Sequence, residues 1–143
     1  MAHDFERFPE LTNSQMEIYY FDSPHKQIFE DFTARVVKVH DGDTITVRWR
    51  ERDFDFPIRF DDVAAPELNE EGGIEAQQWL ENRILNKEVD IIVNEKRVEK
   101  WGRLLAGVVH GGQNVGDEEI MRGLAKPWAQ GKEGTIPNAF KSK

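Results

Sequence analysis

Three short segments of the chain carry the residue types that phosphate chemistry needs. They are Asp41-Gly42-Asp43-Thr44, the stretch from Arg59 to Pro66-Glu67, and Lys100-Trp101-Gly102-Arg103. Carboxylate oxygens are the ligands that calcium and magnesium prefer, and a carboxylate also serves as the base that orients and activates water. Arginine binds phosphate through a forked set of donors. Together the segments predict a site for a hard cation and a phosphate group.

Each segment taken alone has a simpler interpretation. An Asp-Gly pair is favoured in hairpin turns, so Asp41 and Asp43 are also explained by a turn between two strands. A single arginine on a strand is explained by a solvated face. Only the combination of the three segments carries the prediction of a site.

The composition narrows the class of protein. A net charge of −8 argues against a general polyanion binder, because counterion release needs clustered lysine and arginine. Residues 1–33 hold seven acids and two bases, so much of the acidity belongs to this segment and a local basic site remains open. The absence of cysteine excludes disulfides and thiolate metal sites.

No membrane association is expected from the sequence. No apolar run approaches the roughly 18 residues of a membrane span. The acidic N-terminal residues lack the apolar region of a signal peptide. We therefore expect a cytoplasmic protein.

The hydrophobic pattern predicts a small barrel. Alternating apolar residues predict strands at 34–39, 44–50, 54–62, 88–94 and 103–109, and 3.6-residue spacing predicts helices at 74–85 and 117–124. Asp117, Glu118 and Glu119 are interpreted as the acidic start of the second helix, where they complement the macrodipole. The order of elements predicts a mainly β (α+β) fold, a five-stranded OB-type Greek-key barrel with two helices and an extra N-terminal arm.

Three regions are expected along the chain. Residues 1–33 form an acidic, aromatic-rich arm in which Met16–Phe21 is interpreted as a strand. Its many aromatic residues argue against disorder, so we expect it to pack on the domain; a partner-binding surface is the alternative. Residues 34–128 form the barrel domain, and residues 129–143 form an irregular tail.

Four motifs in this domain resemble the staphylococcal nuclease (thermonuclease) family in order and in approximate spacing. They are Val37–Thr44, Arg59 with Ala65-Pro66-Glu67, Lys100–Arg103, and Gly123-Leu124-Ala125-Lys126. The resemblance covers about residues 34–128 and implies an OB barrel with helices. It also implies a calcium-dependent phosphodiesterase that acts on DNA and RNA.

The resemblance assigns a role to each matching residue. Asp43 is implied as a direct calcium ligand, and Ala65 as the position that offers its backbone carbonyl to the metal. Glu67 is implied as the base, and Arg59 and Arg103 as the groups that bind the scissile phosphate. Lys100 and Trp101 are implied at the nucleotide pocket, where the family often has tyrosine in place of Trp101.

One position departs from the family pattern. Ala64 stands where the family has its second metal carboxylate, and alanine cannot bind a cation. Such a loss is expected to cost at least about 10–100-fold in metal affinity or activity. Asp62 is the candidate replacement ligand, because it lies two residues before Ala64 and would share its face if the strand continues to that position. The alternative is that Asp61 and Asp62 only solvate a strand end.

Two functions follow. The first is a calcium-dependent nuclease that cleaves single-stranded DNA or RNA, with activity weakened by Ala64. The alternative is a non-catalytic OB-fold module that binds nucleic acid or a protein partner.

Overall fold

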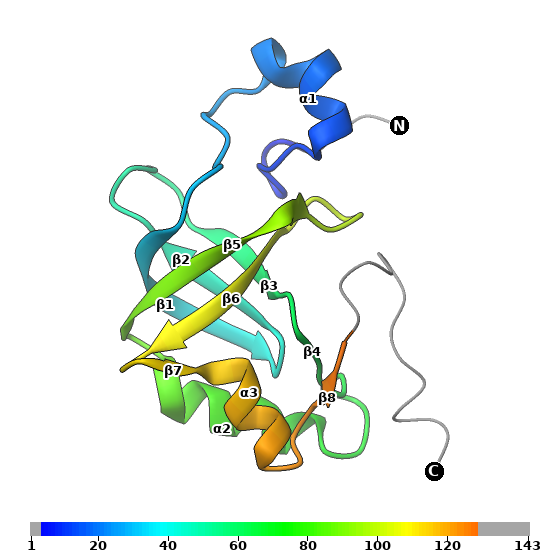
Figure 1. Ribbon diagram of the computed structural model, residues 1–143, viewed down its shortest axis with the longest axis vertical. Helices are drawn as coiled ribbons and strands as arrows, with labels where there is room; N and C mark the ends of the chain where they lie inside the picture. The colour runs from blue at the N-terminus through cyan, green and yellow to red at the C-terminus, as the bar shows by residue number, and fades with distance from the viewer. Residues whose placement is uncertain (1–3, 129–143) are drawn as a thin grey trace.

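A closed barrel of five strands forms the centre of the molecule, as seen in the computed structural model, which describes residues 4–128 (Figure 1). The strands are β1 (Phe32–Asp41), β2 (Thr44–Arg48), β3 (Phe56–Phe60), β5 (Glu88–Val98) and β6 (Leu104–His110). Their order is β3-β2-β1-β5-β6, and a parallel pairing of β3 with β6 closes the barrel. This arrangement confirms the predicted OB-type barrel.

Two helices lie at one end of the barrel, and α1 lies at the other (Figure 1). The two are α2 (Gly73–Ile84) and α3 (Val115–Met121). Three short strands complete the domain: β7 (Gln113–Asn114) pairs antiparallel with β6, and β4 (Val63–Ala64) pairs with β8 (Lys126–Pro127). Within residues 4–128 no helix is long and apolar enough to cross a membrane.

The β1–β2 hairpin shows why the sequence folds in this way. Ile45 and Val47 alternate with polar residues on β2, and both are fully buried in the barrel core. Asp41 pairs with Thr44 across the turn, so the Gly42-Asp43 pair forms the hairpin loop. The first predicted motif therefore lies at the end of a hairpin, at the edge of the core.

The predicted strand at Met16–Phe21 is wrong. The segment belongs to helix α1 (Asn13–Tyr19) and to the 3₁₀ turn η1 (Tyr20–Asp22) that follows it. A capping box starts the helix: Thr12 Oγ1 accepts from the Gln15 backbone N–H at 3.1 Å, and Gln15 Oε1 accepts from the Thr12 N–H at 2.9 Å. This local hydrogen bonding outweighs the β-propensity of the aromatic residues.

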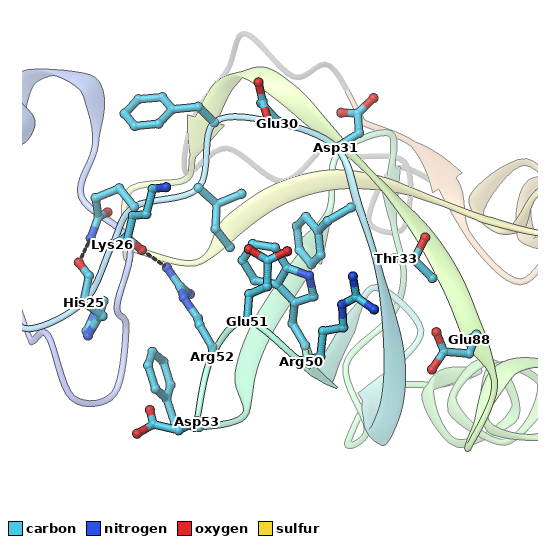
Figure 2. Close-up of a pocket in the computed structure, with 16 residues that line it drawn as sticks. His25, Lys26, Glu30, Asp31, Thr33, Arg50, Glu51, Arg52, Asp53 and Glu88 are labelled. Carbon is cyan, nitrogen blue, oxygen red and sulfur yellow. Dashed lines mark hydrogen bonds between the residues drawn. The ribbon is translucent and has the colours of Figure 1, made fainter.

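The segment before β1 makes buried contacts with the barrel. Leu11 and Ile28 are buried, and Glu10 forms ion pairs with Arg52 and Arg97 of the barrel domain. A cavity of about 1170 Å³ lies between this segment and the turn after β2, where Arg52 donates to the Lys26 carbonyl (Figure 2). None of the predicted site residues lines this cavity. The predicted irregular tail, 129–143, lies outside the described residues.

Candidate active site

Asp43 is the centre of the contacts that join the predicted site residues. Its side chain is almost fully buried at the β1–β2 turn. Oδ2 accepts from the Ala65 backbone N–H at 2.9 Å, and Oδ1 accepts from the Thr44 hydroxyl at 3.1 Å. The Asp43 N–H in turn donates to Asp41 Oδ1 at 3.1 Å, a side-chain turn that fixes the hairpin loop. The first and second motifs therefore meet at Asp43.

Arg59 reaches Asp43 from β3. Its Nη2 lies 3.4 Å from Asp43 Oδ2, an ion pair without hydrogen-bond geometry. Its Nη1 donates to the carbonyls of Phe60 and Val63, and the guanidinium lies 4.1 Å from the centre of the Trp128 ring. Arg59 is thus held rigidly, and burial lowers its pKa from the ordinary value.

Arg103 joins the same group through a hydroxyl. Its Nη1 donates to Thr44 Oγ1 at 3.3 Å, and Thr44 donates to Asp43. Its Nε and Nη2 each donate to the carboxylate of Glu99 at 3.1 Å. Two of its nitrogens thus fix the side chain, which keeps 24% of its surface exposed. Asp43, Arg59 and Arg103 come from three segments and form one connected cluster.

An open cavity of about 540 Å³ lies beside Arg103. Trp101 lines it with 59% of its surface exposed, and Lys100 places its ammonium 4.9 Å from the centre of the Trp101 ring. Arg7 and Phe8 of the N-terminal segment also line this cavity. An exposed indole beside arginine is suited to stack on a base next to a bound phosphate.

Glu67 is not joined to this cluster. It is exposed in the loop between β4 and α2, and within residues 4–128 its carboxylate makes no hydrogen bond or ion pair. The backbone is better fixed, because the Glu67 N–H donates to Glu70 Oε1 at 2.8 Å. The structure therefore leaves the carboxylate free to meet solvent or a ligand.

Comparisons with known proteins identify the family of this chain. The family model described as "Staphylococcal nuclease homologue" matches residues 57–140. The chain belongs to the staphylococcal nuclease family. It is 36% identical over 109 residues to a "Micrococcal nuclease" of Shigella flexneri, covering 69% of this chain and 59% of that protein.

A second relative is more distant. An "Uncharacterized endonuclease" of Haemophilus influenzae is 31% identical over 100 residues, covering 70% of this chain and 53% of that protein. The chain thus spans little more than half the length of these two relatives of the staphylococcal nuclease family.

Ala64 has a physical explanation in this member of the staphylococcal nuclease family. The side chain is fully buried in a small apolar cluster with Leu105 and Trp128. Pairing of β4 with β8 places Ala64 opposite Lys126, which brings Trp128 over this position. The space that a carboxylate would need is therefore filled by apolar atoms.

Asp62 lies against helix α3. A Cβ at Gly116 would stand 2.6 Å from Asp62 Oδ1, so the carboxylate packs directly on the first turn of α3. Burial raises the pKa of Asp62 to about 6, and the charges of Asp61 and Asp117 add to the shift. Asp61 is buried and accepts from Asn94 Nδ2 at 3.1 Å. Metal binding by Asp62 stays a prediction.

Glu119 is an acidic residue whose burial was not predicted from the sequence. Its interpretation as part of an acidic helix start holds for Asp117 and Glu118, which lie in the first turn of α3, whereas Glu119 is fully buried. Burial raises its pKa to about 10, and the charges of Asp43 and Asp62 add to the shift. The available signal was its spacing of four residues from the buried Val115, which places both on one helix face.

The side chains near the turn suit a hard cation. Asp43 offers a carboxylate, and both oxygens of the buried Glu119 lack a hydrogen-bond partner within residues 4–128, so they are available to a cation. Burial and the charge of Asp43 also raise the pKa of Asp41 to about 7. Among the described residues, no three acidic or histidine side chains are already arranged as a metal site. Calcium accepts flexible oxygen ligands, so the donor chemistry fits.

Replacing Glu119 with leucine is expected to stabilise the metal-free protein, and more so as the pH rises. The pKa of Glu119 is about 10 in the folded state and has an ordinary value of 4.5, so the folded state holds a proton that the unfolded state releases. Stability then falls between these pH values, by at most about 1.4 kcal/mol per pH unit. The charged groups that face Glu119 are Asp41, Asp43, Asp62 and Arg59.

Urea unfolding in chelator at pH 5 and pH 8 measures this difference between wild type and Glu119→Leu. Because the surrounding groups are present in both proteins, the comparison isolates Glu119. An equal difference at both pH values contradicts the assignment.

Proposed function

We propose that this chain is a calcium-dependent phosphodiesterase that hydrolyses DNA or RNA, single-stranded forms included. The observation that carries the proposal is the connected cluster at Asp43. Arg59 lies 3.4 Å from it, and Arg103 reaches it through the Thr44 hydroxyl. Arg103, fixed beside an open cavity, with Arg59 buried against the same carboxylate, supports binding of a phosphodiester rather than barrel packing alone.

Each residue has a task in this proposal. Arg103 donates to the scissile phosphate and stabilises the charge that builds up as the bond to the leaving oxygen breaks. Arg59 holds Asp43 in place and adds positive charge behind it. Glu67, whose carboxylate is unbonded in the described residues, takes the proton of the attacking water. Trp101 and Lys100 hold the neighbouring nucleotide.

Asp43 would hold the cation, with the backbone carbonyl of Ala65 as the ligand that the family resemblance implies. The Ala65 N–H already donates to Asp43, so the two residues are adjacent. When bound, calcium would polarise the phosphoryl oxygens and orient the nucleophile.

A cleavage assay tests the proposal. Single-stranded DNA and single-stranded RNA, each carrying a fluorophore and a quencher, are incubated with the chain in calcium, in magnesium and in chelator. We expect cleavage in calcium and loss of cleavage in chelator. Absence of cleavage of both polymers at every cation concentration contradicts the proposal.

A second candidate function rests on the burial of Arg59. It is only 3% exposed and lies under Trp128, so a phosphate reaches it only if Trp128 moves. This observation favours a non-catalytic OB module that binds nucleic acid through the exposed Trp101 and Arg103. Binding of DNA that is insensitive to chelator and falls steeply with salt, without cleavage, identifies this alternative.

Replacing Gly73 with alanine is expected to reduce cleavage by displacing Glu67. A Cβ at Gly73 would overlap the Glu67 carbonyl oxygen and stand 2.6 Å from its carbonyl carbon, so the backbone of the loop has to move. A misplacement of about 1 Å costs on the order of 100-fold in rate.

Rate measurements on Gly73→Ala test this expectation, with Gln78→Ala as the control because Gln78 is exposed on the same helix. Thermal unfolding of both variants reports whether they fold. A rate equal to wild type for a folded Gly73→Ala protein removes Glu67 from the mechanism.

A further inference from the structure

Within residues 4–128, Glu119 is a buried carboxylate without a hydrogen-bond partner. Its exposed fraction is 0%, and neither Oε1 nor Oε2 has a hydrogen-bond partner among the described residues. It is the one carboxylate in residues 4–128 for which both oxygens are in this state. Buried polar groups are nearly always bonded, because leaving one unpaired costs free energy. Such a group indicates a missing ligand, ion or water.

The carboxylate points at the turn that carries Asp43. Glu119 Oε2 lies 3.4 Å from the position of a Cβ at Gly42, the residue between Asp41 and Asp43. The same Cβ position is 2.6 Å from the Cβ of Ala65. Glu119 of α3 therefore lies against the Gly42 turn, and this turn also packs closely on Ala65.

The position that the family uses for its second carboxylate is closed here. Ala64 packs against Leu105 and Trp128, so no side chain from that position reaches the turn. A carboxylate is thus lost on the β4 side, while an unpaired one appears on the α3 side. Glu119 thus offers a second carboxylate near the turn, which matters because charge count tunes the affinity of calcium sites.

We propose that Glu119 supplies the metal carboxylate that Ala64 lacks, so that Glu119 and Asp43 bind one divalent cation at the Gly42 turn. This inference rests on the proposed function, because the cation is the one that phosphodiester cleavage needs. It assigns a role to a residue outside the motifs of the family. It also replaces Asp62, whose carboxylate lies against Gly116, as the principal candidate.

Cation binding is measured on the full chain without nucleic acid. Calcium is titrated calorimetrically, and thermal unfolding is followed with and without calcium. The variants are Glu119→Gln, which keeps the shape, and Glu119→Leu, which removes the polar group. The control is Glu75→Gln, because Glu75 is an exposed carboxylate of α2.

Wild type and the control are expected to bind calcium and to unfold at a higher temperature in its presence. Glu119→Gln is expected to bind at least about tenfold more weakly, and Glu119→Leu is expected to lose the calcium-dependent shift. Both variants are expected to unfold in chelator at or above the temperature of wild type, which shows that they fold.

Two results overturn the inference. One is equal calcium affinity of Glu119→Gln and wild type, and the other is wild type that binds no calcium, so that Glu119 is only a neutral buried acid. Cleavage assays separate this failure from failure of the proposed function. Calcium-dependent cleavage that persists in Glu119→Gln supports the proposed function but rejects Glu119 as a metal ligand. Calcium binding that depends on Glu119, without any cleavage, supports the metal site but rejects the proposed nuclease function.

Discussion

Replacing Arg103 with glutamine is expected to lower the cleavage rate constant by about 100- to 1,000-fold, which is the usual loss when one charge-stabilising donor is removed. Arg103 is suited to this role because Glu99 and Thr44 fix its guanidinium while 24% of its side chain stays exposed. The guanidinium of Arg103 can therefore bind the substrate phosphate without changing its conformation. The effect is expected in kcat more than in KM, because the interaction strengthens as charge builds on the phosphate.

Arg103→Lys separates charge from geometry. Lysine keeps the positive charge but lacks the fork, so it cannot bond Glu99 through two nitrogens and still reach Thr44. We expect the cleavage rate constant of Arg103→Lys to lie between those of wild type and Arg103→Gln. Equal losses in the two variants indicate that the planar fork, rather than charge, is what the reaction uses.

A matched control removes a different arginine. Arg35 is a half-exposed residue of β1, and Arg35→Gln is expected to cleave at the wild-type rate. Urea unfolding of each variant is needed because Arg103 also pairs with the buried Glu99. A folded Arg103→Gln protein that cleaves within about threefold of wild type removes Arg103 from the mechanism and favours the binding module.

The barrel was predictable because its signal is local. Alternation at Ile45 and Val47, and the Asp41-Gly42 turn, each depend on a few adjacent residues, and the structure places these valine and isoleucine side chains in the core. Helix α1 was missed although its signal is also local. The capping box from Thr12 to Gln15 fixes the helix start, and the aromatic content of the segment suggested a strand instead.

The cluster at Asp43 was predicted only as a set of residues. Its geometry depends on contacts between segments that are far apart in the chain. Ala64 is closed off by Trp128 because β4 pairs with β8, and Glu119 is buried because α3 packs under the barrel. No pattern within a short window contains these pairings. The sequence therefore located the missing carboxylate at Ala64 but not the unpaired one on α3.

Replacing Glu10 with glutamine is expected to destabilise the protein by about 3–5 kcal/mol, because it leaves two buried guanidinium groups without their counter-charge. Glu10 Oε1 lies 2.5 Å from Arg52 Nη2, and Oε2 lies 3.3 Å from Arg97 Nη2. All three side chains are at most 6% exposed. Burial lowers the pKa of both arginines from the ordinary value, because it removes their charges from water.

Without Glu10, Arg52 and Arg97 keep only contacts with neutral groups among the described residues. Arg52 donates to the Lys26 carbonyl at the edge of the cavity in Figure 2, and its guanidinium lies over Phe56 at 4.5 Å. Arg97 donates to the carbonyls of Leu11 and Ile28. These acceptors all belong to residues 11–28, so loosening this segment removes several bonds at once. The loss is therefore expected to exceed that of a single ion pair.

Urea unfolding followed by tryptophan fluorescence and by circular dichroism measures the change. Glu6→Gln is the control, because Glu6 is an exposed acid of the same segment and its replacement is expected to change stability by less than about 0.5 kcal/mol. A single coincident transition, shifted strongly by Glu10→Gln, means that the N-terminal segment unfolds together with the barrel. A change in the free energy of unfolding as small as that of Glu6→Gln means that the segment detaches without destabilising the barrel. Residues 4–31 would then be an appendage that meets the barrel by contact alone, and Arg7 and Phe8 would not be fixed parts of the cavity beside Arg103.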